Sequence, residues 1–124
     1  MKYIFLLITF SFSLIVKAQQ SINLDEVGKH IGDSVKVCGQ VYDTYYAIRT
    51  ENTPTFLNIG AKYPDQKLTV VIWGEVRKQF DFKPEEFYKE KQVCILGKIT
   101  EYQKKPQIVI AAINQITIDK PSNK

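Results

Sequence analysis

The chain has 124 residues, a formal net charge of +4 and two cysteines, Cys38 and Cys94. This length is enough for one domain around one hydrophobic core. The small positive charge does not by itself indicate a nucleic-acid ligand, and the wide spacing of the two cysteines excludes a zinc knuckle and a Cys-x-x-Cys redox motif.

Residues 1–18 have the pattern of a secretory signal peptide. Lys2 precedes an apolar run over residues 3–16, and a small residue stands before the expected cleavage site. The run is short for a membrane span, which argues against the alternative, an N-terminal anchor helix. We therefore expect export, with a periplasmic or secreted mature chain that begins at Gln19 and has no stable membrane span. Removal of Lys2 and Lys17 would lower the formal charge of +4 by two, to +2.

Residues 23–31, with the sequence N-L-D-E-V-G-K-H-I, are predicted to form a short helix. Asn23 is a good N-cap, and the two acidic residues after it lie near the positive end of the helix dipole. Leu24, Val27 and Ile31 share one face at helical spacing. The segment is therefore typical of one amphipathic helix ahead of the first strand.

The pattern apolar-x-apolar-x-Gly-x-apolar occurs twice, as V-K-V-C-G-Q-V over 35–41 and as V-C-I-L-G-K-I over 93–99. Alternation with period two predicts a strand with one buried face. A glycine inside such a strand removes the side chain where the strand bends sharply or where another backbone approaches closely. Two long strands kinked at matching positions, over about 34–48 and 92–102, therefore indicate a small closed barrel rather than a flat sheet.

The other segments complete an all-β domain. In chain order they are strands over 55–59 and 67–73, a helical segment over 75–89, a turn over 103–105 and a strand from Pro106 that continues through Ile118. Three strands, a helical segment and two more strands form the order of a five-stranded OB-fold barrel. We expect one OB-fold domain over 19–124, with its core at about 34–118, a short N-terminal helix and a helical segment between strands three and four.

Cys38 and Cys94 are predicted to form a disulfide. In an OB-fold barrel the first and fourth strands are antiparallel neighbours, and each cysteine has the parity opposite to the inward apolar residues of its strand. A bridge across these strands would stabilise the fold by roughly 4 kcal/mol in the chain-entropy model. The alternative is two free thiols that serve as small strand residues.

Four segments carry a resemblance to known proteins: F-L-N-I-G at 56–60, T-V-V-I-W-G at 69–74, V-C-I-L-G-K-I-T-E-Y at 93–102 and P-Q-I-V-I at 106–110. They resemble the small bacterial OB-fold proteins classed as nucleic-acid-binding-like, and also OB-fold modules attached to some exported nucleases. The first segment is similar to the second strand of OB domains that bind tRNA anticodons. The resemblance spans roughly 34–118 and implies the fold more specifically than the ligand.

The chain carries few residues in catalytic patterns. His30 is the single histidine and lies in the predicted helix, where a surface or packing role is usual. The sequence has no Gly-x-Ser-x-Gly elbow, phosphate loop or metal-spaced histidine pair. Nucleases of the staphylococcal type share the barrel but use acidic metal ligands and paired arginines, and this chain offers only Arg49 and Arg77. We expect a binding protein that is not an enzyme and uses no cofactor or metal.

The outer face of the second and third strands is the predicted binding surface. If Leu57 and Val70 point into the barrel, Phe56 and Trp73 point outward and form a stacking platform, with Asn58 as a hydrogen-bonding partner. OB domains bind oligonucleotides and oligosaccharides on this face. Aromatic rings stack on bases, and cations from the flanking loops follow the backbone. The predicted binding residues are Tyr45, Tyr46, Arg49, Phe56, Asn58, Lys62, Tyr63, Trp73, Lys104 and Lys105.

Two questions stay open from the sequence. Reversed strand parity would bury Phe56 and Trp73 in the core, and tyrosines at strand ends often pack on a barrel rim with the hydroxyl in water. The first hypothesis for the ligand is single-stranded nucleic acid. The second is an oligosaccharide, a small molecule or an envelope protein, because nucleic acid is not the usual ligand of an exported protein.

Overall fold

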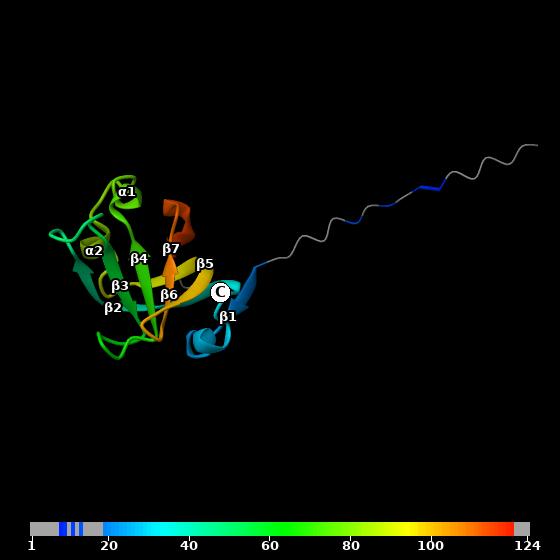
Figure 1. The fold of residues 1–124 in the computed structure, drawn as a ribbon, viewed down its shortest axis with the longest axis horizontal. Coiled ribbons are helices and arrows are strands. Elements are labelled where there is room, and N and C mark those ends of the chain that lie inside the picture. The colour runs from blue at the N-terminus through cyan, green and yellow to red at the C-terminus, as the bar shows by residue number, and fades with distance from the viewer. Residues whose placement is uncertain (1–7, 10, 12, 14–18, 121–124) are drawn as a thin grey trace, which may run out of the picture.

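The computed structural model describes residues 8, 9, 11, 13 and 19–120. The predicted signal peptide over 1–18 falls largely outside these residues, and so do the last four positions of the chain. Among the described residues, no helix combines the length and the apolar character needed to cross a membrane. Residues 19–120 form one β-barrel with short helical segments at its ends (Figure 1).

Seven strands make up the β structure of the described residues. They are β1 (Gln20–Ile22), β2 (Ser34–Tyr46), β3 (Thr55–Ile59), β4 (Leu68–Ile72), β5 (Gln92–Tyr102), β6 (Lys105–Val109) and β7 (Ile116–Ile118). The pairings run β2–β3–β4–β6–β5 and return from β5 to β2, so these five strands close a ring. With the helical segment between β4 and β5, this is the OB-fold barrel that the sequence predicts.

The short strands β1 and β7 are additions to the five predicted strands. β1 pairs in parallel with the first half of β2, and β7 pairs antiparallel with the first half of β5. Each has three residues, which is too short to show an alternating pattern in the sequence. They exist because the ends of the two long strands leave backbone groups that a neighbouring segment can pair.

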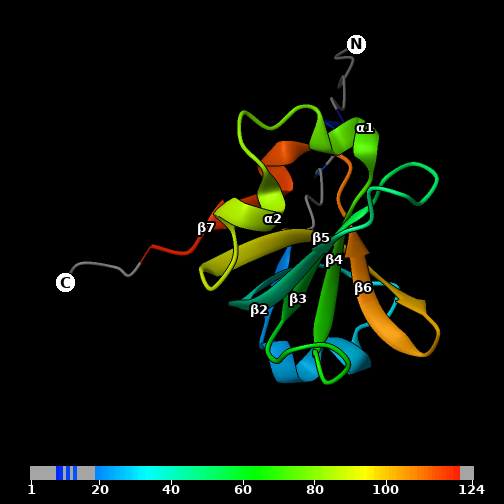
Figure 2. The ribbon, with the colours of Figure 1, turned by 90° about the vertical axis from the view of Figure 1, so that its left-hand side faces the viewer.

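The helical segments are shorter than the sequence suggests. A 3-10 helix, η1 (Leu24–Lys29), precedes β2, α1 (Gly74–Arg77) and α2 (Pro84–Phe87) lie between β4 and β5, and a 3-10 turn, η2 (Ile113–Gln115), precedes β7. Asn23 stands at the N-cap of η1 as predicted, but its side chain makes no capping hydrogen bond. Figure 2 shows η1 at one end of the barrel and both α-helices at the other.

The core confirms the predicted parity of β3 and β4. Leu57 and Ile59 of β3 and Leu68, Val70 and Ile72 of β4 are at most 1% exposed and belong to one hydrophobic cluster. Their alternation leaves the residues between them on the outer face of the sheet. The reversed parity, which would bury Phe56 and Trp73 in the core, is therefore wrong: Phe56 is half-buried and Trp73 is 41% exposed.

The two strand glycines lie where a side chain would not fit. A Cβ atom at Gly39 would come 2.7 Å from Cγ2 of Ile59, and one at Gly97 would come 2.7 Å from Cγ2 of Ile108. Both isoleucines are almost fully buried, so neither can move away cheaply. The sequence predicts a sharp bend or the close approach of another backbone at these glycines; the close neighbour in each case is instead a core side chain.

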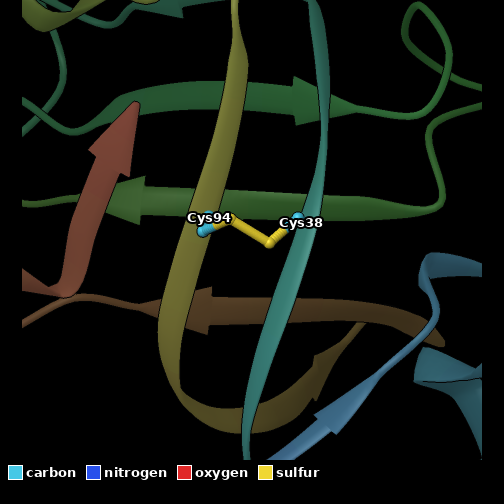
Figure 3. Close-up of a disulfide and its surroundings, with 2 residues drawn as sticks. All are labelled: Cys38 and Cys94. Atoms are coloured by element: carbon cyan, nitrogen blue, oxygen red, sulfur yellow. A yellow bond between two sulfur atoms is a disulfide. The ribbon is translucent and has the colours of Figure 1, made fainter. Parts of the chain in front are cut away.

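The predicted disulfide between Cys38 and Cys94 is confirmed. The two residues are directly opposite in the antiparallel pairing of β2 with β5, and their sulfur atoms are 2.02 Å apart (Figure 3). The neighbouring residues Val37 and Val93 are buried in the core, so both cysteines lie on the other face of their strands. The bridge thus joins the two long strands of the barrel at matching positions.

A β-bulge in β2 reverses the parity of that strand. The pairing with β3 shifts between Val41, which is opposite Ile59, and Asp43, which is opposite Asn58. Two residues of β2 therefore match one of β3, with Tyr42 as the extra residue. Strict alternation from Val41 would turn Asp43 and Tyr45 into the barrel; after the bulge they lie on the outer face instead.

Candidate functional site

A groove of about 640 Å³ crosses the outer face of β2, β3, β4 and β6. Its ends are formed by the β3–β4 turn and the β5–β6 turn, which lie toward the end of the barrel that carries η1 (Figure 2). The lining residues are Asp43, Thr44, Tyr45, Phe56, Asn58, Tyr63, Gln66, Thr69, Tyr102, Gln103, Lys105, Pro106 and Gln107. This is the face on which OB-fold domains bind their ligands.

Two parallel rows of side chains form the outer face, because neighbouring strands pair in register. The polar row runs Asp43, Asn58, Thr69 and Gln107 across β2, β3, β4 and β6. The apolar row, two residues further along each strand pair, runs Tyr45, Phe56, Val71 and Val109. The groove therefore has an aromatic wall next to a row of hydrogen-bonding groups.

The polar row is linked by hydrogen bonds that run in one direction. The Gln66 amide donates to the Thr69 hydroxyl at 3.1 Å, and that hydroxyl donates to Oδ1 of Asn58 at 3.3 Å. Nδ2 of Asn58 then donates to Oδ1 of Asp43 at 2.8 Å. The other carboxylate oxygen of Asp43 accepts from the backbone N–H of Tyr63 at 3.2 Å. Asp43 is the acceptor at which the chain of donors ends.

Aromatic rings form the wall and the rim of the groove. The rings of Tyr45 and Phe56 are stacked, with centroids 6.3 Å apart and planes within 10°. Tyr45, Tyr63 and Tyr102 are each more than 60% exposed, so their rings are open to a ligand. The half-buried Phe56 and the exposed Tyr45 beside it, with nearly parallel rings, offer a flat apolar surface.

Lys105 joins the two turns that bound the groove. Its ammonium group contacts the backbone oxygen of Pro64 in the β3–β4 turn and lies 5.7 Å from the centre of the Tyr63 ring. Among the residues that line the groove, Lys105 carries the positive charge and Asp43 the negative charge. The lining is therefore close to neutral overall, and its polarity comes mainly from amides and hydroxyls.

Five of the ten predicted binding residues come together in this groove: Tyr45, Phe56, Asn58, Tyr63 and Lys105. Lys62 and Lys104 lie in the two flanking turns and do not line the groove. Arg49 lies in the loop between β2 and β3, which Figure 2 shows toward the opposite end of the barrel. Lys62 and Lys104 therefore flank the groove, and Arg49 lies away from it.

Tyr46 lies away from the groove, on the other side of β2 from Tyr45. The guanidinium carbon of Arg77 sits 3.8 Å above the centre of its ring. Arg77 also donates two hydrogen bonds to Glu85, the shorter one 2.6 Å long, and this pairing raises the pKa of Arg77 above its ordinary value. Tyr46 thus has a packing role between β2 and the two α-helices, and it does not belong to the candidate site.

Trp73 is not next to Phe56 in one binding surface. It precedes α1 and lines a separate hollow of about 150 Å³ with Asn52, Thr53 and Lys78. Its parity is the predicted one, but β4 has already ended, so its side chain lies over the β2–β3 loop at the far end of the barrel. The predicted platform of Phe56 and Trp73 is therefore replaced by the stacked pair Tyr45 and Phe56.

Several lining residues are not among the predicted binding residues: the polar Asp43, Gln66, Thr69 and Gln107, and Tyr102 and Pro106 at the rim. Alternation in the sequence could have identified Gln107 and Thr69 as outward residues, since both alternate with core residues of their strands. Asp43 carries a different signal. It is a charged residue at a position that strict alternation would bury, and because burying a charge is costly, it indicates that the alternation is interrupted before it.

One group of possible metal ligands lies close together in the described part of the chain: Cys38, Cys94 and Asp119. The two sulfur atoms are bonded to each other, so they do not act as thiolate ligands in this state. The groove itself offers one carboxylate, Asp43, which is already paired with Asn58 and Tyr63. The arrangement is suited to stacking and hydrogen bonding.

Known structures resemble this chain in its fold. No protein-family model matches the sequence, and no curated protein matches it. The OBody AM1L10, solved bound to hen egg-white lysozyme, is similar with a TM-score of 0.59 and 16% identity over 86% of this chain and 98% of that chain. A structure of yeast Stn1 and Ten1 is similar with a TM-score of 0.60 and 11% identity over 85% of this chain and 65% of that chain.

A Leishmania major Friedlin protein assigned as an aspartyl-tRNA synthetase is similar with a TM-score of 0.54 and 13% identity. The match covers 86% of this chain but only 22% of that protein, so this chain spans a small part of its length. At these identities the likeness shows the fold alone. Together with the strand order and the closed ring of pairings, it establishes that the chain is an OB-fold protein.

Proposed function

We propose that this OB-fold protein binds single-stranded nucleic acid in the groove between the β3–β4 and β5–β6 turns. The observation that carries the proposal is the pairing of an aromatic row with a polar row on one sheet face. A nucleobase has a flat face and a polar edge, and the two rows present a partner for each. In duplex DNA the base faces are stacked and the Watson–Crick edges are paired, so a single strand is the better fit.

The charges around the groove fit a single strand bound mainly through its bases. Lys105 lies at the rim, with Lys62 and Lys104 in the flanking turns, where phosphates of a bound strand would pass. Asp43 lies in the polar row and would repel a phosphate there. The sugar–phosphate chain is therefore expected along the rim, and the bases over Tyr45 and Phe56.

An oligosaccharide is the second candidate, and the near-neutral lining of the groove favours it. Sugars stack their apolar faces on aromatic rings and exchange hydrogen bonds with carboxylates and amides, which Asp43, Asn58 and Gln107 supply. OB-fold domains bind oligosaccharides on this same face. This ligand would need no cation, so its binding would not depend on salt.

The binding test uses fluorescence-labelled 12-nucleotide single strands of DNA and RNA, with an oligosaccharide panel beside them. We expect single strands to bind and Tyr45→Ala to weaken binding by about 1–3 kcal/mol, the usual contribution of one stacked base. Tyr42→Ala is the matched control, because Tyr42 is also exposed on β2 but does not line the groove. Trp73→Ala is expected to leave the affinity unchanged for the same reason.

If the protein bound oligosaccharides but no single strands, the oligosaccharide would replace single-stranded nucleic acid as the proposed ligand. Equal losses in Tyr45→Ala and Tyr42→Ala would contradict the groove as the binding surface. Thermal melting of each variant identifies losses of affinity that come from unfolding, and the exposure of all three side chains makes such losses small.

We also propose that the protein is exported and binds its ligand without catalysis. The disulfide supports export, because such bonds persist in oxidising compartments and are rare in the cytosol. Mass analysis of the protein recovered from its native cells is expected to give an N-terminus at or near Gln19. Recovery from the cytosol with Met1 intact would contradict export, and turnover of a bound single strand would contradict the binding role.

A further inference from the structure

We propose that Asp43 selects guanine among the bases of a bound single strand; this inference rests on the proposed function and specifies its ligand. Gln66, Thr69 and Asn58 each donate one hydrogen bond in a chain that ends at the Asp43 carboxylate. This direction fixes Asp43 as the acceptor that the polar row presents to a ligand. The base edge that fits there is one that carries N–H donors.

The Asp43 carboxylate keeps acceptor capacity for such an edge. Two carboxylate oxygens offer about four lone-pair sites. One site is used by Nδ2 of Asn58 at 2.8 Å and one by the backbone N–H of Tyr63 at 3.2 Å. One lone pair on each oxygen therefore remains, and the side chain lines the groove. Because both oxygens are anchored by the protein, the carboxylate is held in one orientation for a two-point contact.

Guanine is the base whose Watson–Crick edge carries two neighbouring donors, the N1–H and the N2 amino group. Thymine and uracil place a carbonyl oxygen on each side of their single N–H. Cytosine and adenine place a ring nitrogen acceptor next to the amino group. Each of these acceptors would face a carboxylate oxygen, which is repulsive, whereas guanine meets both oxygens with donors.

The position of Asp43 also fits a base stacked on the aromatic wall. Asp43 and Tyr45 lie on the same face of β2, and their partners Asn58 and Phe56 are two residues apart on β3. A ring on the Tyr45 and Phe56 pair would direct its edge along the sheet toward the polar row. The bulge at Tyr42 produces this arrangement, since it turns both Asp43 and Tyr45 outward.

The experiment compares labelled 12-nucleotide oligothymidines that carry one central dG, dI, dA or dC, with purified protein. A two-point contact discriminates by about 1–3 kcal/mol, so one dG is expected to bind about ten-fold more tightly than the all-dT strand. Inosine keeps the N1–H but lacks the N2 amino group, so dI is expected to lose most of that gain. Strands with dA or dC are expected to bind no better than all-dT.

The matched variants are Asp43→Asn and Asp81→Asn. Asp43→Asn is expected to bring the dG-to-dT affinity ratio close to one, because the amide presents one acceptor in place of two. Asp81→Asn makes the same chemical change at an exposed residue outside the groove and is expected to keep the ratio. If Asp43→Asn does not fold, the comparison of dG with dI on the unaltered protein still tests whether the N2 amino group of guanine is recognised.

Equal affinity for dG and dI, or a dG preference that persists in Asp43→Asn, would overturn the guanine assignment. When all strands bind equally and Tyr45→Ala weakens every one of them, the proposed binding groove stands and the role of Asp43 fails. When none of the strands binds, both the guanine assignment and the proposed function fail. The failures of the two proposals are therefore separate results.

Discussion

Arg77 connects three parts of the barrel end through one side chain. It lies in α1, pairs with Glu85 of α2 and covers the ring of Tyr46 from β2 at 3.8 Å. Both members of the ion pair are largely buried, with side-chain exposures of 20% and 14%. A planar guanidinium satisfies a carboxylate with two donors and a ring with its flat face, which an ammonium group cannot do together.

Arg77→Lys is expected to lower the free energy of unfolding by about 1–3 kcal/mol, because Glu85 loses its paired donors in a partly buried position. Chemical denaturation measures the change. Lys78→Ala is the control, since the ion pair of Lys78 with Glu75 is exposed and its loss is expected to cost no more than about 0.5 kcal/mol. Equal stability of Arg77→Lys and the unaltered protein would show that the paired and stacked guanidinium does not stabilise the fold.

At the scale of the element, β2 has two irregular positions with different structural roles. Gly39 lies where Ile59 and Leu24 fill the space that a side chain would need. The bulge at Tyr42 then reverses which residues face outward. The first half of the strand pairs with β5 and the second half with β3, so the strand changes partner between these two positions.

Gly39→Ala is expected to destabilise the protein by about 1–3 kcal/mol, the usual cost of adding a methyl group to a filled core. Its Cβ would lie 2.7 Å from Ile59, which is 1% exposed and has no room to move. Gly28→Ala is the control, because a Cβ at Gly28 has no other atom within 4 Å. We expect Gly28→Ala to melt at or slightly above the temperature of the unaltered protein; a similar loss in both variants would contradict the packing argument.

At the scale of the whole molecule, the charge balance limits how a single strand is held. The formal charge is +4, or +2 without residues 1–18, and the groove lining carries one ammonium group and one carboxylate. Proteins that bind through many phosphate contacts lose affinity steeply with salt. The affinity of a protein that binds mainly through bases depends only weakly on the salt concentration.

The logarithm of the binding constant for a single strand is therefore expected to fall with the logarithm of the salt concentration with a slope of about −0.7 to −2, equivalent to one to three phosphate contacts. Lys105→Ala is expected to flatten that slope by about 0.7, because its ammonium group lies at the rim of the groove. Lys104→Ala, one position away and outside the lining, is expected to change it less. A slope steeper than about −3 would point to a larger cationic surface than the groove provides.

Alternation along the chain by itself determined much of the fold. The inward residues of β3 and β4, the bounds of β3 and β5 and the shared face of Cys38 and Cys94 all follow from period-two patterns. Parity also placed Phe56 and Asn58 on the outer face, and both residues line the groove there. These features depend on neighbours along the chain, so the sequence contains the information directly.

The tertiary structure alone decided which outward residues meet. The bulge that turns Asp43 and Tyr45 outward depends on how β2 pairs with β3, and within β2 only the charge of Asp43 indicates its position. The contact of Lys105 with the β3–β4 turn depends on which barrel end each turn reaches. Trp73 has the outward parity that the sequence predicts, but it lies at the end of the barrel away from the groove. A binding surface is assembled from several strands at once, and closure of the barrel sets their relative positions, which local patterns do not encode.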